Sequence, residues 1–245
     1  MEAKPFAFCD LSVVEKYAEL KEGEEKLPTS AHRPIVLLDK NPSLDDLDDI
    51  SPGLGNTGIY LPYSGFHYVL FHYLNSDGII MTSANVPGET MVIRNEDAFL
   101  LKADYFLLHN RKIVNRIDDS VVRCYGGNFF RKSRGFIPSG MKVPYKDRVL
   151  SLGAGENVSF SISKNNNLYS SQYIGNTFHY PTLEFLASSK EQMMGLLGLR
   201  MDEIDAIGVW ICIHGIQRGD MVKNWRKNIQ LNWLRCNIIG LMPLF

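Results

Sequence analysis

The sequence has no apolar stretch that could cross a lipid bilayer. A membrane-spanning helix needs about 20 mainly apolar residues, and no segment of the 245-residue chain approaches that length. The beginning, M-E-A-K-P-F, lacks the charged-then-apolar order and the small-residue cleavage site of a signal peptide. We therefore expect a cytoplasmic protein without a membrane partner.

Cysteine is scarce and the net charge is small. The four cysteines, at positions 9, 124, 212 and 236, form no C-x-x-C pair, so neither a disulfide framework nor a zinc ribbon is predicted. His67, His72 and His109 also lack metal-ligand spacing to a carboxylate or cysteine, and we predict packed or surface histidines and no metal ligands. The net charge of -1 gives no overall field that attracts nucleic acid. Any anion site must therefore come from a local arrangement.

Strand-like and helix-like segments alternate along the chain, which predicts an α/β architecture. A chain that is 45% hydrophobic can bury a substantial core. The charged, proline-containing stretch 142–148 indicates a domain boundary, and Asn165-Asn166-Asn167 predicts a hairpin turn. Apolar patterns predict strands at 34–38, 58–61, 78–81, 105–108, 120–123, 149–152, 159–163 and 168–171, and helices at 10–26, 68–74, 95–102 and 182–199.

One strand runs directly into a small polar turn, Thr82-Ser83-Ala84-Asn85. In open α/β sheets, ligands bind outside the carboxyl ends of strands, and a hydroxyl with an amide there can bind phosphate or ribose without adding negative charge. An ordinary strand-to-helix turn has the same composition, and spacing alone favours that interpretation.

A basic tract follows and carries only two local acidic residues. Its arginines suit phosphate oxygens, so the tract can hold a triphosphate or an RNA backbone, although a solvated surface is the commoner role of a charge run. The acidic pair Asp118-Asp119 can coordinate magnesium or cap the strand that follows, and capping is favoured. The tract consists of Arg111, Lys112, Arg116, Arg123, Arg131, Lys132 and Arg134.

These segments occur in an order that resembles one family, the HypF carbamoyltransferases, and in particular their central YrdC-like domain. Pro87 departs from the family pattern, which has serine there. The matching segments are K-P-F-A at 4–7, R-P-I-V-L-L at 33–38, I-S-P-G-L at 50–54, L-P-Y with His67, T-S-A-N-V-P-G-E at 82–89, A-D-Y-F-L-L-H-N-R at 103–111, D-D-S-V-V-R at 118–123 and R-K-S-R-G-F-I-P at 131–138.

The resemblance implies a fold and a reaction. Residues 1–140 are expected to form a YrdC-like twisted sheet with flanking helices, in which carbamoyl-adenylate is made from ATP, with Mg²⁺, and carbamate. Such chemistry depends on positioning and charge neutralisation rather than on a covalent nucleophile, and no catalytic residue is assigned. The positions that match the ATP site of the family are Lys4, Ser83, Asn85, Ser120, Arg131 and Arg134.

Residues 147–209 resemble the start of the next HypF domain, which has an actin-like, sugar-kinase-type (ASKHA) fold. In the family this domain transfers the carbamoyl group to the C-terminal cysteine of a HypE-like partner, for the cyanide ligands of NiFe hydrogenases. Gly155 and Asn157 stand where the family has glutamate and lysine. This departure argues against nucleotide binding by the second domain.

Two other functions remain open at this point. YrdC-like domains are associated with double-stranded RNA, so an RNA-binding module is the first alternative. A relative of the threonylcarbamoyl-adenylate synthases is the second, although those proteins lack the D-Y-F-L-L-H-N-R segment. The family has a glycine-rich strand and a lysine-arginine pair before Lys4, so we expect an incomplete adenylation site and a chain that is inactive alone.

After Val209 the resemblance ends abruptly. Codons permitted by the next residues, read in a shifted frame, spell V-D-M-H-P-R-Y-S-T-R, and those of residues 232–243 spell L-A-E-M-Q-H-H-W-A-H-A. Both strings resemble the HypF transferase domain, the second its metal-binding histidine motif. Residues 210–245 are therefore interpreted as an out-of-frame tail, without the metal site of the family.

Re-sequencing of the gene across codon 209 tests this hypothesis. We expect a single-base insertion or deletion there, relative to a frame that continues with the family sequence. An uninterrupted frame supported by many reads, in an organism whose HypF is encoded elsewhere, would show that the tail is genuine protein.

Overall fold

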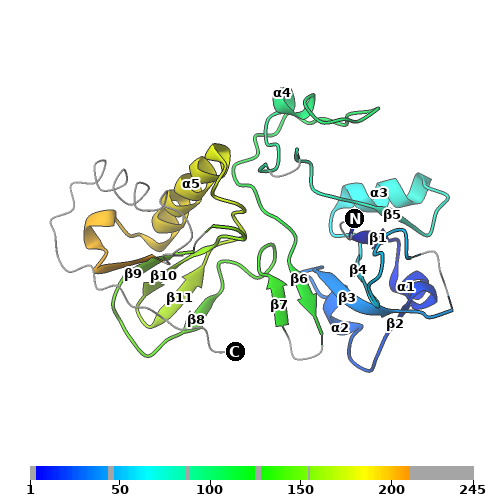
Figure 1. The fold of residues 1–245 in the computed structure, drawn as a ribbon, viewed down its shortest axis with the longest axis horizontal. Coiled ribbons are helices and arrows are strands. Elements are labelled where there is room, and N and C mark those ends of the chain that lie inside the picture. Colours follow the sequence, from blue (N-terminus) through cyan, green and yellow to red (C-terminus); the bar gives the residue numbers. More distant parts are fainter. Residues whose placement is uncertain (1–3, 44–46, 87–88, 125–127, 154, 210–245) are drawn as a thin grey trace. The chain divides into compact units, whose positions relative to one another are not determined.

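The chain folds into two compact units, each built from two segments. The computed structural model describes residues 4–43, 47–86, 89–124, 128–153 and 155–209, and the predicted out-of-frame tail lies outside them. The first unit comprises Met1–Ala84 and Ile117–Phe136, and the second Asn85–Arg116 and Ile137–Phe245 (Figure 1). In the described part, no helix has the length and apolar character that a bilayer crossing requires.

The first unit is organised around a mixed seven-stranded sheet. The strand order is β5-β1-β4-β3-β6-β7, and β2 pairs with β3. The pairs β1–β4 and β3–β6 are parallel, and the other pairs are antiparallel. The strands are β1 (Phe6–Phe8), β2 (Ala18–Glu19), β3 (Ile35–Lys40), β4 (Asn56–Tyr60), β5 (Gly78–Ile80), β6 (Val121–Arg123) and β7 (Asn128–Arg131).

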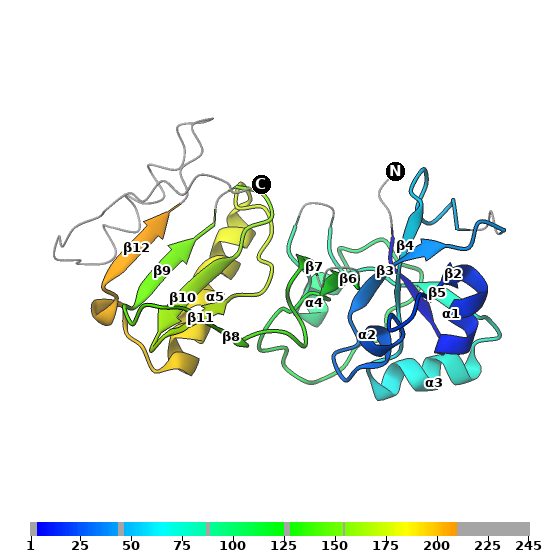
Figure 2. The ribbon, with the colours of Figure 1, turned by 90° about the horizontal axis from the view of Figure 1, so that it is seen from below.

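Alternating side chains of these strands supply two hydrophobic clusters, because neighbouring residues of a strand face opposite sides of its sheet. Phe8, Val36 and Ile59 pack with Val14 of α1 (Leu11–Tyr17). Their strand neighbours Ala7, Ile35 and Tyr60 pack with Phe71 of α3 (Gly65–Tyr73). A short α2 (Lys26–Thr29) completes the unit. The sheet is thus covered on both faces (Figure 2).

The second unit has a five-stranded sheet in the order β12-β9-β10-β11-β8. Its long helix α5 packs Phe185 and Met194 onto Leu150, Phe160 and Ile162 of the sheet. The elements are α4 (Asn95–Ala98), β8 (Gly140–Lys142), β9 (Val149–Leu152), β10 (Phe160–Lys164), β11 (Asn167–Ser170), α5 (Tyr180–Leu197), a 3₁₀ helix (Met201–Glu203) and β12 (Ala206–Val209).

The predicted α/β class is confirmed, and so is the hairpin at the asparagine run. Asn165 and Asn166 adopt φ of 52° and 60°, the left-handed pair of a type I′ turn, which asparagine tolerates. β10 and β11 pair directly across it.

Three predicted elements were wrong in extent or in kind. The helix predicted over 10–26 ends at Tyr17, because Ala18 and Glu19 extend to pair with β3. The helix predicted over 95–102 stops at Ala98. Residues 105–108 form no strand, and Tyr105 is 93% exposed. The run of apolar residues there predicts a buried strand, but several of these side chains are exposed.

A glycine and a lysine end helix α5. Gly198 takes the left-handed conformation, with φ of 59°, and Leu199 N donates to Met194 O at 2.9 Å, as in a Schellman motif. Lys164 Nζ donates to Leu197 O, which places a positive charge at the negative end of the helix dipole. Three carbonyls of the last turn of α5, those of Met194, Gly195 and Leu197, therefore accept hydrogen bonds.

Replacing the two glycines of this helix end should have opposite effects. Gly198→Ala should destabilise the second unit by about 1 kcal/mol, because alanine is strained at this φ. Gly195→Ala should stabilise it by about 0.5–1 kcal/mol, since Gly195 is helical and a Cβ there meets nothing within 4 Å. Hydrogen exchange of the α5 amides measures both changes. Equal effects of the two variants would contradict the cap.

Candidate functional site

Charged, hydroxyl and aromatic side chains gather in the first unit around the start of β6. Asp118 and Asp119 precede this strand, and Arg131 ends the adjacent β7. Ser83 comes from the turn after β5, and Tyr63 from the loop between β4 and α3. Segments far apart in the sequence therefore supply one cluster.

The first part of the cluster is a serine–aspartate–arginine group. Ser83 Oγ donates to Asp118 Oδ1 at 3.3 Å, and Arg131 Nη1 lies 3.5 Å from the same oxygen. Burial raises the pKa of Asp118, and the Arg131 charge and the Ser83 hydrogen bond partly offset this rise. The Asp118 carboxyl group thus lies in a poorly solvated position beside neighbours that can also bind phosphate.

The second part is a clamp formed by Arg134. Its Nε donates to Asp119 Oδ1 at 2.8 Å, Nη1 to His32 O at 2.9 Å and Nη2 to Arg33 O at 2.8 Å. The guanidinium carbon also lies 3.6 Å from the ring centroid of Tyr63. Each nitrogen of this guanidinium therefore has a partner inside the protein.

Ser120 supports the turn that carries this clamp. Its side chain is fully buried, and its hydroxyl donates to Arg134 O at 2.9 Å and accepts from Ser133 N at 2.8 Å. Both hydrogen bonds of this hydroxyl are to the backbone, so Ser120 holds the turn that carries Arg134 and does not face the cluster with a free hydroxyl.

Lys4 and Asn85 are less closely tied to the cluster. Lys4 precedes β1, and Met81 N donates to Pro5 O at 3.3 Å, which brings the two chain segments together. Asn85 belongs to the second unit. Its amide donates to Val86 O at 3.1 Å and Glu89 O at 3.3 Å, as in an ordinary turn. Of the six residues predicted from the resemblance, the structure brings Ser83, Ser120, Arg131 and Arg134 together.

The sequence reasoning missed the roles of the acidic pair and of Tyr63. Within the residues that the structure describes, the Asp118 and Asp119 carboxylates accept no hydrogen bond from a backbone N–H, and they pair with Arg131 and Arg134 instead. The sequence separation between the D-D-S and R-K-S-R segments does not predict this pairing. The L-P-Y segment resembles the family sequence, but nothing in it predicts that the Tyr63 ring lies against the Arg134 guanidinium.

His67 also lies beside the cluster, as a packed histidine. It is 8% exposed, and its ring meets Tyr63 edge-on at 4.5 Å. Burial lowers the pKa of His67, so the ring is neutral at pH 7. Across the described ranges, no group of three or more His, Cys, Asp or Glu side chains is arranged to hold a metal ion.

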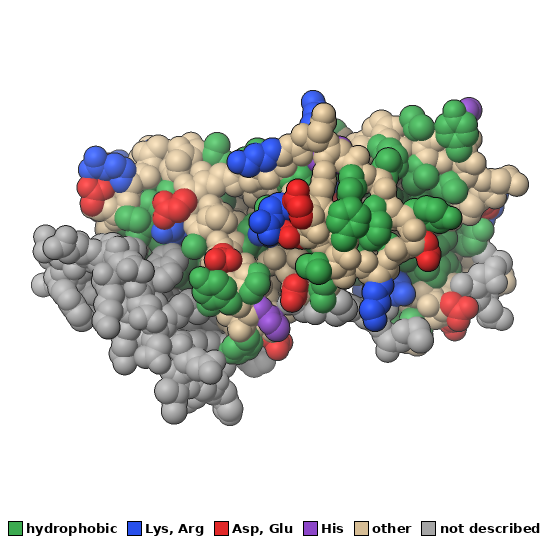
Figure 3. All heavy atoms as spheres, turned by 90° about the horizontal axis from the view of Figure 1, so that it is seen from above, with side chains coloured by type: hydrophobic (Ala, Val, Ile, Leu, Met, Phe, Trp, Pro, Cys, Tyr) green, Lys and Arg blue, Asp and Glu red, His purple; other side chains and the backbone are tan. Residues whose placement is uncertain are grey.

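Several arginines of the basic tract are paired with acidic residues of the same unit. The two units divide the tract after Arg116. Arg123 Nη2 donates to Asp39 at 3.2 Å, and Arg131 and Arg134 pair with acids. On the face drawn in Figure 3, Lys and Arg side chains occur in separate groups, several beside acidic ones. Much of the positive charge is therefore neutralised locally.

The loop after β9 in the second unit is tight and built on backbone contacts. A Cβ on Gly153 would lie 2.6 Å from Ser159 O. Gly155 has φ of 73° and Asn157 of 54°, and Thr177 Oγ1 donates to Gly155 O at 3.1 Å. The glycine and asparagine that depart from the family pattern thus suit the left-handed backbone here.

Two family models match the chain. The model of the Sua5, YciO and YrdC proteins, described as telomere recombination, matches residues 2–133. The HypF Kae1-like domain matches residues 144–206.

Curated relatives and solved structures agree with these matches. The chain is 40% identical over 214 residues to the "Probable carbamoyltransferase HypF" of Methanocaldococcus jannaschii and 33% identical over 224 residues to carbamoyltransferase HypF2 of Cupriavidus necator. The two matches cover 83% and 81% of this chain, but the chain spans only 27% and 28% of the length of the two relatives. The crystal structure of T. kodakarensis HypF superposes with a TM-score of 0.86 at 37% identity, covering 93% of this chain and 30% of that one.

A second solved structure carries ligands. It is a full-length HypF in a phosphate- and nucleotide-bound form, with a TM-score of 0.80 at 29% identity. The match covers 94% of this chain and 30% of the solved chain.

Replacing Asp118 should change the pH dependence of stability. Because the folded-state pKa of Asp118 is raised, its ionisation costs stability that is absent below the unfolded pKa of about 3.9 and grows as pH rises. The stability of Asp118→Asn relative to the parent chain should therefore increase between pH about 4 and neutrality. Urea denaturation at a series of pH values measures this.

Asp10→Asn is the matched control of opposite sign. The Ser12 and Val13 hydrogen bonds lower the pKa of Asp10, so the parent should hold an advantage at neutral pH that disappears as pH falls through that lowered value. A flat or reversed profile for Asp118→Asn would contradict the raised pKa of the buried Asp118 carboxyl group.

Proposed function

This chain belongs to the Sua5/YciO/YrdC family and is of the HypF type, and we propose that it carries part of the site at which the intact protein binds ATP and forms carbamoyl-adenylate. In this reaction a carbamate oxygen attacks the α-phosphorus of ATP. The new P–O bond joins carbamoyl to AMP, and the bond to pyrophosphate breaks. Atoms and charge balance without a covalent enzyme intermediate.

The Ser83–Asp118–Arg131 group is the observation that carries this proposal. Adenylate formation needs donors that hold phosphate oxygens and offset the charge that develops on them. Ser83 offers a hydroxyl beside Asp118 at 3.3 Å, and Arg131 offers a guanidinium whose fork suits phosphate. Lys4 and Asn85 are proposed to complete the site from the adjoining segments.

Asp118 is the residue that would hold Mg²⁺. Magnesium in nucleotide sites is bound through one or two carboxylates together with the phosphates. The Asp118 carboxylate suits this role because it is largely desolvated and its Oδ1 lies beside Arg131 and Ser83. When bound, Mg²⁺ would neutralise phosphate charge and release Arg131 toward the phosphates.

Arg134 and Ser120 are proposed to position the site instead of contacting the nucleotide. The Arg134 guanidinium donates hydrogen bonds to Asp119 and to two backbone carbonyls. The Ser120 hydroxyl is hydrogen-bonded to the backbone of the 133–134 turn. Their presence in the family motif is then explained by the geometry they impose on Asp118 and Arg131.

The complete activity is proposed only for the longer protein. The relatives named carbamoyltransferase HypF are more than three times as long as the matched part of this chain. We propose that the intact protein passes the carbamoyl group to the C-terminal cysteine of a HypE-like partner during hydrogenase maturation. The described part of the second unit would contribute the beginning of that transferase domain.

Replacing Ser83 or Asn85 with alanine should weaken any ATP binding, by about 1–3 kcal/mol each if the change leaves a buried polar group of the nucleotide unpaired. Isothermal titration calorimetry of the chain with MgATP measures this. Ser12→Ala is the control, because Ser12 bonds to Asp10 at the start of α1, on the other face of the sheet. Equal affinities for the parent chain and both site variants would refute the assignment.

A nucleic-acid function gives the opposite pattern. A salt-dependent gel shift with double-stranded RNA in the absence of nucleotide would favour an RNA-binding module. Stabilisation of the chain by MgATP without an RNA shift favours adenylation.

A further inference from the structure

Helix α3 of the first unit carries no acidic, lysine or arginine side chain. Its sequence is G-F-H-Y-V-L-F-H-Y, and it lies within a run from position 50 to position 76 that contains no Asp, Glu, Lys or Arg. A helix that is largely apolar on all sides is ordinarily buried in a protein. The position of α3 in its unit therefore decides whether this apolar surface is covered.

One side of α3 packs on its own unit, and the opposite side faces outward. His67 is 8% exposed, and Phe71 packs against the sheet. Phe66, Val69 and Tyr73 are 51%, 56% and 81% exposed. Because residues three and four apart share one face of a helix, these three side chains form a continuous outward row, which we call the α3 stripe. Figure 2 shows α3 along the margin of the first unit.

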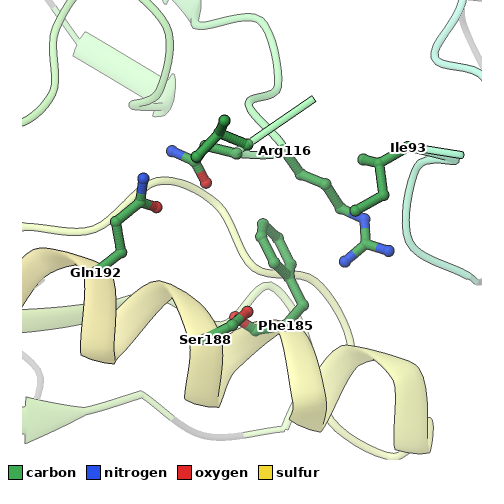
Figure 4. Close-up of a pocket in the computed structure, with 7 residues that line it drawn as sticks. Ile93, Arg116, Phe185, Ser188 and Gln192 are labelled. Atoms are coloured by element: carbon green, nitrogen blue, oxygen red, sulfur yellow. The ribbon is translucent and has the colours of Figure 1, made fainter. Parts of the chain in front are cut away.

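The outward face of a helix normally carries polar side chains. Helix α5 of the second unit follows this rule, since Figure 4 shows Ser188 and Gln192 on the side of α5 that turns toward Arg116. The α3 stripe has only the Tyr73 hydroxyl as a polar group. A continuous exposed apolar surface is typical of a protein contact site. The α3 stripe therefore has the character of an interface.

The chemistry and spacing of the α3 stripe suit a second copy of the same surface. Two such stripes bring no charge against a like charge, and the net charge of the chain is only -1. Phe66 lies three residues before Val69, and Tyr73 lies four residues after it. If two α3 helices run antiparallel about a two-fold axis at Val69, Phe66 of each copy meets Tyr73 of the other. The symmetric contact thus forms two aromatic pairs.

The size of the α3 stripe sets the strength of this contact. An aromatic side chain buries about 150–250 Å² when it is fully covered, so three side chains supply less than the about 800 Å² per partner of a stable interface. The matched part of the chain spans only 27% and 28% of the length of its relatives, so their remaining parts are not present to cover α3. In a solution of this chain, the available apolar surface is that of another copy.

We propose that the α3 stripe is a self-association surface through which two copies of this chain form a weak two-fold dimer. Val69 lies at the symmetry axis, and Phe66 packs against Tyr73 of the second copy. The proposal stands on α3 alone and does not depend on the adenylation assignment.

Sedimentation equilibrium of the 245-residue chain tests the association. Between about 10 µM and about 1 mM, the average mass should rise from monomer toward dimer with a dissociation constant on the order of 100 µM, as expected for a small interface. A chain that stays monomeric over this range would overturn the proposal and assign the α3 stripe to another part of the longer protein.

Charged variants at the axis test the two-fold register. Val69→Asp and Val69→Lys should each weaken self-association at least about tenfold, because two like charges then meet at the axis. An equimolar mixture of the two variants should associate at least about threefold more tightly than either alone, since opposite charges meet instead. Both variants should keep the thermal unfolding midpoint of the parent, because Val69 is more than half exposed.

Leu196→Lys is the matched control, because Leu196 is an exposed helical leucine of the second unit. It should leave self-association unchanged, and an equal loss in this variant would overturn the proposal in favour of general apolar adhesion. Unchanged association in both Val69 variants would overturn it as well. A mixture no tighter than its components would refute the two-fold register. If the Val69 variants do not fold, Tyr73→Ala decides, with an expected weakening of at least about threefold.

Discussion

The Arg134 clamp is the constraint on which the first unit's cluster depends. One guanidinium joins the carboxylate of Asp119, two carbonyls just before β3, and the Tyr63 ring. Only arginine offers several donors in one rigid plane. Removing it would leave three acceptors unsatisfied at a half-buried site, which is costly.

Backbone geometry makes that clamp possible. Gly135 has φ of 85°, and a Cβ there would lie 2.9 Å from His32 Cβ. The chain can turn so closely past His32 only with glycine at this position. Ser120, buried below, ties the same turn to the start of β6. The orientation of Asp118 and Arg131 therefore follows from residues that need not touch a ligand.

The two arginine–aspartate pairs behave differently although they are neighbours in sequence. Arg134 is saturated by its protein contacts, whereas the 3.5 Å approach of Arg131 to Asp118 is looser. A cluster with two acids and two arginines carries no net charge, so it is stable without a ligand. We propose that phosphate or a cation enters at the looser Arg131–Asp118 pair. In the second unit, Arg116 is partly buried and forms no ion pair with any acidic residue that the structure describes.

Much of the architecture could be predicted from local patterns. The apolar runs of β3, β9 and β10, the amphipathic α5 and the asparagine turn at 165–166 depend on residues close in sequence. The motif segments also indicated the family and most members of the site. Where local signals misled, as at 105–108, the segment had apolar residues but no strand to pair with it.

The sequence by itself determined the α/β class, the family and the residue types available for phosphate chemistry. Only the tertiary structure decided which arginine pairs with Asp118 and which pairs with Asp119 and the backbone before β3. Asp118 and Asp119 are adjacent in sequence, yet one shares its oxygen with Ser83 and Arg131 and the other is held by Arg134. That division arises from contacts across the fold, between the turn after β5, the start of β6 and the end of β7, and no local pattern encodes such distances.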